Sequence, residues 1–222
     1  MINLWIRFWN GFTKITAWPV QKLVFRIKVY CEDPSIQTRR IKGSAIIISN
    51  HTSVFDYAAF IFVFFSRTLR YQMAEILFEK KLLGIFLKLL GGIRVDRKSH
   101  NFGFLSASEN ILSKGGVVGV FPESRLPLPG EERPIPFKPS AAYLALSSGA
   151  KVIPVYTNGD YFSSRHARVY IGKPFFAADL VEDNLSEKET IDLVSQKMRQ
   201  CIIDLGNKLN EEVCKEKGKA SV

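Results

Sequence analysis

The chain has 222 residues, which is enough for one hydrophobic core of ordinary size but not for two. Its hydrophobic fraction of 46% and mean hydropathy of +0.02 exclude a disordered chain and a protein with many membrane-spanning segments. The formal net charge of +10 predicts an anionic partner, either nucleic acid or anionic lipid. Aromatic residues gather in apolar segments and do not alternate with Arg and Lys, which favours lipid.

Cysteines and histidines are too few and too scattered to form a disulfide scaffold or a metal site. The three cysteines contain no CxxC pair, and an odd number without a convincing signal peptide fits a reducing cytoplasm. The three histidines do not stand at the spacing of metal ligands. We therefore expect no bound metal.

The first 44 residues are predicted to form an amphipathic helical segment. Apolar side chains recur at helical spacing from Leu4 to Ile15, and Pro19 predicts a break between two short helices. Basic residues interrupt every apolar run before it reaches the roughly 18 residues that a membrane-spanning helix needs. The segment either lies in the headgroup layer of an anionic membrane or packs on the rest of the protein, and we favour membrane contact.

From residue 45 onward, short β-branched runs alternate with helical patterns. We predict strands at residues 45–49, 69–74, 92–96, 116–121, 151–157 and 167–171. We predict helices at residues 53–65, 78–90, 102–112 and 140–146, and a long C-terminal helix that begins with a capping box of Ser186 and Glu189. Residues 45–222 are therefore expected to form one α/β domain, with a largely parallel mixed sheet flanked by helices.

The sequence NHTSVFD, at residues 50–56, follows the first predicted strand of this domain. His51 is expected at the carboxyl end of that strand, where ligand sites of open α/β sheets gather. Asp56 falls in the first turn of the next helix and can reach back to the imidazole. A carboxylate on one ring nitrogen fixes the tautomer, so the other nitrogen can accept a proton from a hydroxyl. No serine or cysteine nucleophile is apparent, so we expect the hydroxyl to belong to a substrate.

Three further strand ends carry unusual residues. GGIRVDR ends in Arg97, and arginine suits bidentate binding of phosphate. VGVFPESR places Glu123 and Arg125 at the start of a loop, residues 124–136, that holds four of the ten prolines. A long loop directly after a strand is more often functional than idle, although a stiffened surface loop is the alternative. VIPV, at residues 152–155, has a proline inside a strand pattern, which predicts an edge strand or an irregular bend.

In this order and spacing the four motifs resemble the blocks of the glycerolipid acyltransferase family, typified by 1-acyl-glycerol-3-phosphate acyltransferases. The blocks of that family are HxxxxD, GxxxxxR, FPEGTR and a proline-containing apolar strand. NHTSVFD, GGIRVDR, FPESR and VIPV are similar to them in turn. FKPSAAYLAL, at residues 137–146, resembles the stretch that the family places between the last two blocks.

The resemblance implies that His51 is the general base and Asp56 its orienting partner. It implies that four residues hold the phosphate and glycerol of the acceptor: Arg97, Glu123, Ser124 and Arg125. The acceptor is expected to be lysophosphatidic acid, and the donor a thioester of coenzyme A or of acyl carrier protein. Transfer would be direct, without a metal, cofactor or covalent intermediate, by a peripheral protein at the cytoplasmic face of the cell membrane.

This sequence departs from the family pattern at two places. FPESR is one residue shorter than FPEGTR and has Ser124 where the family has glycine, and AEILF, at residues 74–78, lacks the lysine of an AKxEL-like stretch. Another lysolipid is therefore an alternative acceptor, and a catalytically silent lipid-binding protein with the same fold is a second hypothesis. Nucleic-acid binding has no motif behind it, and we expect none.

Overall fold

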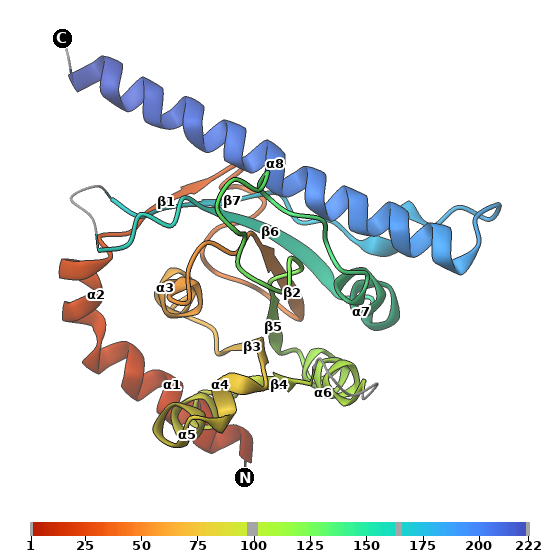
Figure 1. The fold of residues 1–222 in the computed structure, drawn as a ribbon, viewed down its shortest axis with the longest axis horizontal. Coiled ribbons are helices and arrows are strands. Elements are labelled where there is room, and N and C mark those ends of the chain that lie inside the picture. The colour runs from red at the N-terminus through yellow and green to blue at the C-terminus, as the bar shows by residue number, and fades with distance from the viewer. Residues whose placement is uncertain (1, 97–101, 163–165, 221–222) are drawn as a thin grey trace.

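The computed structural model describes residues 2–96, 102–162 and 166–220 (Figure 1). They form a seven-stranded sheet in the order β1-β7-β6-β2-β5-β3-β4. The strands are β1 Lys28–Cys31, β2 Ala45–Ser49, β3 Leu69–Ala74, β4 Ile93–Val95, β5 Val117–Val120, β6 Lys151–Thr157 and β7 Arg168–Ile171. The helices are α1 Ile2–Thr16, α2 Trp18–Val24, α3 Asp56–Val63, α4 Ile76–Glu79, α5 Lys81–Leu89, α6 Gly103–Leu112, α7 Ser140–Ser148, the short 3₁₀ helix η1 Ala177–Leu180 and α8 Glu187–Ala220.

The sheet is parallel throughout except where β7 runs antiparallel to β6, so the predicted fold class is confirmed. All five residues of β2 are buried because helices cover both faces of the sheet. Ile47 packs in one layer with Phe60 of α3 and Leu87 of α5. Its neighbour Ile46 points to the other face and packs in a second layer with Met198 of α8.

Several predicted elements have the expected bounds, and the others differ for local reasons. Strands β2, β3 and β6 begin and end where the sequence predicted. The predicted helix at residues 78–90 is divided into α4 and α5, because Lys80 has an extended backbone with a ψ of 110°. The capping box of α8 is confirmed, since the Ser186 N–H donates to the Glu189 carboxylate at 2.9 Å and the Glu189 N–H donates to the Ser186 hydroxyl at 3.3 Å.

Strand β1 corrects the expected boundary between an N-terminal helical segment and the domain. Residues 28–31 pair in parallel with β7 and form one edge of the sheet. The helical part of the predicted segment 1–44 therefore ends at Val24, and the chain joins the sheet well before residue 45. The sequence KVYC gave no signal because it is short and half-buried along its whole length, and it becomes a strand through pairing with a distant segment.

Pro154 lies in an interior strand, so the expectation of an edge strand is wrong. The alternative expectation, an irregular bend, agrees with a break in strand pairing beside Pro154. β6 pairs with β2 on one side and β7 on the other. Val155 pairs with Ile171 and Val152 with Phe175, which makes three steps along β6 but four along the facing chain. The extra residue is a bulge next to Pro154, where the sheet does not need the missing N–H.

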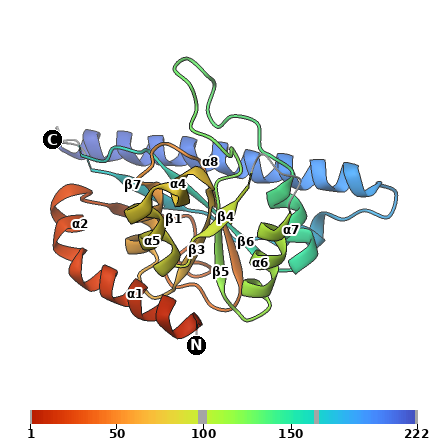
Figure 2. The same cartoon turned by 60° about the horizontal axis from the view of Figure 1, so that its bottom comes forward.

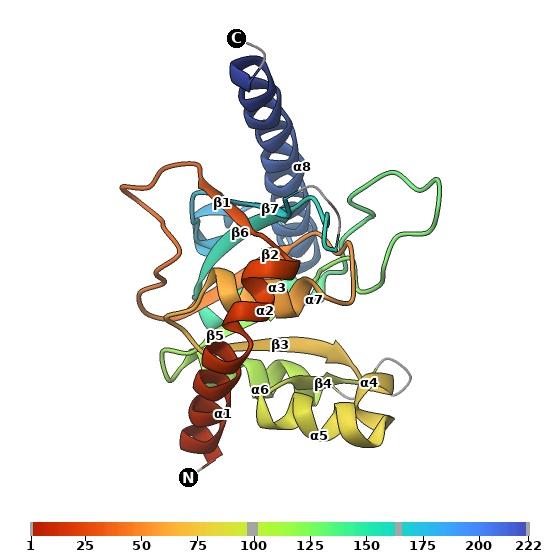
Figure 3. The same cartoon turned by 90° about the vertical axis from the view of Figure 1, so that its left-hand side faces the viewer.

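The N-terminal helices pack on the domain (Figure 3). They also leave large apolar side chains exposed. Three side chains of α1, two of them polar, are buried: Ile6, Asn10 and Lys14. The Asn10 amide donates to the Leu90 carbonyl at 2.8 Å, and the Lys14 ammonium donates to the carbonyls of Phe65 and Arg67 at 3.0 and 2.6 Å. Burial lowers the pKa of Lys14 to about 8. The polar contacts of α1 thus face the protein, and the opposite face carries its exposed aromatic residues.

Candidate active site

The site lies at the carboxyl edge of the sheet, where three neighbouring strands end. β2 lies between β5 and β6, and the three strands are parallel and in register. The chain leaving β2 carries His51, and the chain leaving β5 carries Glu123. Because parallel strands end at the same edge, these side chains meet although they are far apart in the sequence.

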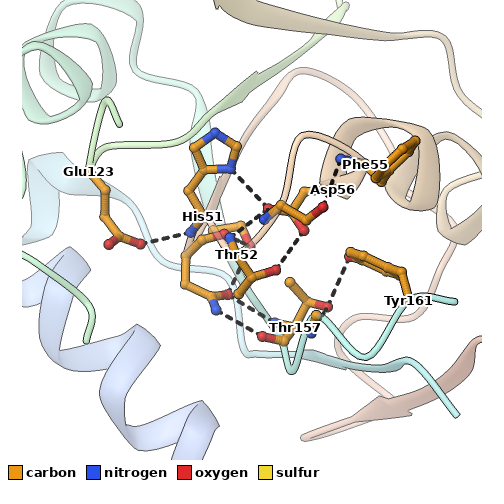
Figure 4. Close-up of polar contacts among 11 residues, drawn as sticks. His51, Thr52, Phe55, Asp56, Glu123, Thr157 and Tyr161 are labelled. Carbon is orange, nitrogen blue, oxygen red and sulfur yellow. Dashed lines mark hydrogen bonds and ion pairs between the residues drawn. The ribbon is translucent and has the colours of Figure 1, made fainter. Parts of the chain in front are cut away.

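Asp56 is fully buried, and its carboxylate holds the loop around His51 through hydrogen bonds (Figure 4). Its Oδ2 accepts from His51 Nδ1 at 2.9 Å and from the backbone N–H groups of Thr52 and Ser53 at 2.7 and 2.9 Å. Its Oδ1 accepts from the Thr52 hydroxyl at 2.8 Å. The carboxylate holds the turn before α3 in place of helical hydrogen bonds, which explains why α3 begins at Asp56 and not at residue 53.

The contacts of Asp56 select the tautomer of the neutral His51 ring. An ionised carboxylate only accepts hydrogen bonds, so Nδ1 of His51 is the donor in this contact, and a neutral ring then has its lone pair on Nε2. The imidazole is 20% exposed and stacks on Phe121, with ring centroids 4.3 Å apart and planes 13° from parallel. Phe121 in turn packs on Tyr71, for whose ring Gly119 leaves space, because a Cβ there would lie 2.2 Å from it. The His51 ring is therefore held between a carboxylate and an aromatic ring.

Three polar residues to which the sequence analysis gave no role connect the loops beside the site: Asn50, Thr157 and Tyr161. The Asn50 amide donates to the Thr157 carbonyl at 2.8 Å and accepts from the Thr157 N–H at 2.9 Å. The Tyr161 hydroxyl lies 3.1 Å from the Thr157 hydroxyl. Burial, and then the negative charge of Asp56, raise the pKa of Tyr161, so it is a neutral phenol. The only sequence signal for these residues was their place at, or a few residues after, the ends of buried strands.

Glu123 is buried and binds backbone N–H groups with both oxygens. Oε1 accepts from the His51 N–H at 2.7 Å, and Oε2 accepts from the Ile135 N–H at 3.0 Å. Burial raises the pKa of Glu123, against the lowering effect of the two N–H donors. The structure therefore gives Glu123 a positioning role, because it joins the backbone of His51 to the far end of the proline-rich loop. A direct contact with the acceptor stays a prediction.

Two other predicted binding residues, Ser124 and Arg125, lie in the proline-rich loop, which extends beyond the sheet (Figure 2). Ser124 has a φ of +57°, a left-handed conformation that favours glycine, and its N–H donates to the Phe121 carbonyl at 2.9 Å. Arg125 forms a two-pronged ion pair with Glu131 at 2.6 and 2.7 Å, and this pair closes the exposed loop on itself. Arg97 lies outside the described residues, so its role also stays a prediction.

The fold and this site define an α/β protein with a carboxylate-bound histidine at the carboxyl ends of parallel strands. A family model described as Acyltransferase matches residues 26–158, and the chain therefore belongs to this family. The 1-acyl-sn-glycerol-3-phosphate acyltransferase of Bacillus subtilis (strain 168) is 26% identical over 148 residues, which cover 64% of this chain and 71% of that protein.

The same fold is present in a solved structure of a protein from another organism. It is the crystal structure of PlsC from Thermotoga maritima, a 1-acyl-sn-glycerophosphate (LPA) acyltransferase. The match has a TM-score of 0.61 and 20% sequence identity and covers 90% of this chain and 79% of that one. At this identity the likeness concerns the fold.

Proposed function

We propose that this acyltransferase moves a fatty acyl group from a thioester donor to the free hydroxyl of lysophosphatidic acid, which yields phosphatidic acid. The observation that carries the proposal is the His51 imidazole, whose Nδ1 is bound by buried Asp56 and whose Nε2 is free to take a proton. The names of the Bacillus and Thermotoga proteins support the choice of acceptor. The donor is acyl-CoA or acylated acyl carrier protein.

The proposed reaction is a direct transfer. Nε2 of His51 removes the proton from the acceptor hydroxyl while the oxygen attacks the thioester carbonyl. Asp56 stabilises the imidazolium that forms, and backbone N–H donors stabilise the oxyanion. The new C–O bond then replaces the C–S bond, and the departing thiolate takes the proton from the imidazolium. The scheme uses no metal, no cofactor and no covalent enzyme intermediate.

The acceptor phosphate is proposed to bind arginine side chains close to this base. Arg97 and Arg125 are the candidates, because guanidinium groups bind phosphate with two hydrogen bonds. Arg125 would exchange Glu131 for the phosphate, since its guanidinium is paired with that carboxylate. We propose that Ser124 sets the direction in which the chain leaves Glu123 and that Glu123 acts through the backbone of His51.

Catalysis is proposed to occur at the surface of an anionic membrane, on its cytoplasmic face. Within the described residues, no helix has the length and apolar character needed to cross a bilayer. Helices α1 and α2 instead expose a set of large apolar side chains: Leu4, Trp5, Phe8, Phe12, Ile15, Trp18, Val20 and Leu23. Such a face, with basic residues nearby, suits peripheral binding in the headgroup layer.

An acceptor comparison tests the proposal. Thiol release and lipid products are measured with a long-chain acyl-CoA or acylated carrier protein and with lysophosphatidic acid, lysophosphatidylcholine or no acceptor. We expect thiol release that requires lysophosphatidic acid and phosphatidic acid as the product. Equal use of lysophosphatidylcholine would contradict the assignment of lysophosphatidic acid as the specific acceptor. Thiol release at the same rate without any acceptor would contradict the transfer reaction itself.

A further inference from the structure

A second hollow lies at the opposite, amino edge of the sheet. It is a pocket of about 910 Å³ between the first turns of α1, the α3–β3 turn and the α6–β5 turn. Figure 2 shows the α6–β5 turn and the proline-rich loop at opposite ends of β5. Since β2 spans five residues at a rise of about 3.3 Å each, the two edges are separated by roughly 15–20 Å. The pocket is thus distinct from the site around His51.

The pocket is basic. Among the described residues that line it, four are cationic and none is acidic: Arg7, Arg67, Arg70 and Lys114. In the described part of the chain, no ion pair involves Arg7, Arg67 or Lys114. The two terminal nitrogens of Arg67 donate to the neutral carbonyls of Ile41 and Gly115. Described carboxylates therefore do not neutralise the charges of Arg7, Arg67 and Lys114.

Further cations stand beside the pocket and repel one another. Burial lowers the pKa of Lys151, and the positive charges of Arg67 and Lys42 lower it further. Like charges in such proximity cost stability in the empty protein, and a bound anion would relieve that cost.

Capping of helix ends accounts for only part of this charge. The carboxyl end of α3 points to the amino edge, and cations are favoured at such an end. Lys14 and Arg39 fill this role, since they donate to carbonyls of residues 62, 63, 65 and 67. Lys42 and Lys114 are exposed and make no such contact, so they provide charge beyond what the helix ends require.

We propose that this pocket binds the phosphate of an anionic phospholipid headgroup. The wall formed by α1 supports this choice, because Ile6 and Arg7 line the pocket while Leu4, Trp5 and Phe8 of the same helix are exposed. The pocket and the proposed membrane-binding face thus share helix α1. The packed sheet separates it from His51, which argues against a docking site for the thioester donor. The inference rests on the proposed membrane contact and not on the acyl-transfer reaction.

Binding to vesicles tests the proposal with charge-matched variants. The pocket variant carries Lys42→Glu and Lys114→Glu, and the control carries Lys188→Glu and Lys197→Glu on the outer face of α8, all at exposed positions outside α1. Both variants change the net charge equally. We expect the pocket variant to lose on the order of tenfold in affinity for vesicles of phosphatidylcholine with phosphatidylglycerol, and the control to lose much less. Binding to pure phosphatidylcholine should not change. Equal losses in the two variants would overturn the site.

Two further measurements distinguish a lipid headgroup from a free anion, and the pocket from the site of the reaction. Titration with inorganic phosphate at constant ionic strength asks whether the pocket takes a free anion. If wild type binds phosphate tightly and the pocket variant does not, while both proteins bind vesicles equally, the occupant is a free anion and not a lipid. Turnover in detergent micelles should be equal in wild type and pocket variant, because the pocket is remote from His51. Loss of turnover in the pocket variant alone would contradict a separate site, whereas inactivity of every protein would bear only on the proposed reaction.

Discussion

The two edges of one sheet carry opposite kinds of polar groups. At the carboxyl edge, the buried carboxylates of Asp56 and Glu123 accept hydrogen bonds from backbone N–H groups, a hydroxyl and an imidazole. At the amino edge, Lys14 and Arg67 donate to backbone carbonyls, and the described residues that line the pocket include four cations and no carboxylate.

Helix α3 shows why this separation arises. The helix runs from one edge to the other, with Asp56 in its first turn, and Lys14 and Arg39 bind carbonyls at its carboxyl end. The helix dipole favours an anion at the first end and cations at the second. The direction of the βαβ units thus places a proton-accepting site at one edge and an anion-binding surface at the other.

We expect Asp56→Asn to reduce turnover more than any other change at the carboxyl edge considered below. The amide replaces one accepting oxygen by an NH₂ group that only donates and can donate to Nδ1 of His51, so the tautomer of the imidazole is no longer fixed. We expect kcat to fall by about 10³–10⁴. Asp192→Asn, at an exposed position on α8, is the matched control and should leave steady-state kinetics unchanged. A kcat of Asp56→Asn close to that of wild type would contradict an orienting role for the carboxylate.

Glu123→Gln should separate a positioning role from contact with the acceptor. The amide presents an NH₂ group to one of two backbone N–H donors, so the backbone of His51 or of Ile135 loses its partner. We expect kcat to fall about 10- to 100-fold and the free energy of unfolding to drop by about 1–3 kcal/mol. The KM for the acceptor should change little. A large rise in KM at constant kcat would instead assign Glu123 to the acceptor.

Arg125→Ala and Glu131→Gln together test whether Arg125, which is paired with Glu131 in the proline-rich loop, also binds the acceptor phosphate. If Arg125 binds the acceptor phosphate, its loss should raise the KM for lysophosphatidic acid by about tenfold or more. Glu131→Gln frees the guanidinium and should leave that KM unchanged or lower it. The same KM in both variants would limit Arg125 to holding the loop closed.

Ser124→Gly should have the smallest effect and should act on stability. The φ of +57° strains any residue with a Cβ, and glycine removes the strain at a cost in chain entropy. We expect a gain of up to about 1 kcal/mol, seen as a rise of about 2–4 °C in the melting temperature. A lower melting temperature would show that the serine hydroxyl contributes more than the strain costs.

The sequence predicted those features that short-range patterns determine. Short β-branched runs between helical patterns predicted the bounds of β2, β3 and β6, and a spacing of five residues predicted the contact of His51 with Asp56. The capping box of α8 was readable for the same reason.

Features that depend on distant partners escaped sequence analysis. The Asn50–Thr157 pair and the two backbone bonds of Glu123 join segments brought together only by the order of strands. β1 is a strand only because β7 lies beside it. The pairing of Arg125 with Glu131 also could not be foreseen, because the loop folds back on itself around residues whose conformation no periodicity determines.

Acceptor-dependent thiol release shows whether the Nε2 of His51 activates the acceptor hydroxyl. The rate is measured with a long-chain acyl-CoA in the presence and absence of lysophosphatidic acid for wild type, His51→Ala and His166→Ala. His166 is the matched control, because its imidazole contacts the Arg26 carbonyl away from the site. We predict that wild type and His166→Ala release thiol only with the acceptor and that His51→Ala loses at least about 10³ of this rate. Full activity of His51→Ala, with a melting temperature equal to that of wild type, would contradict the account.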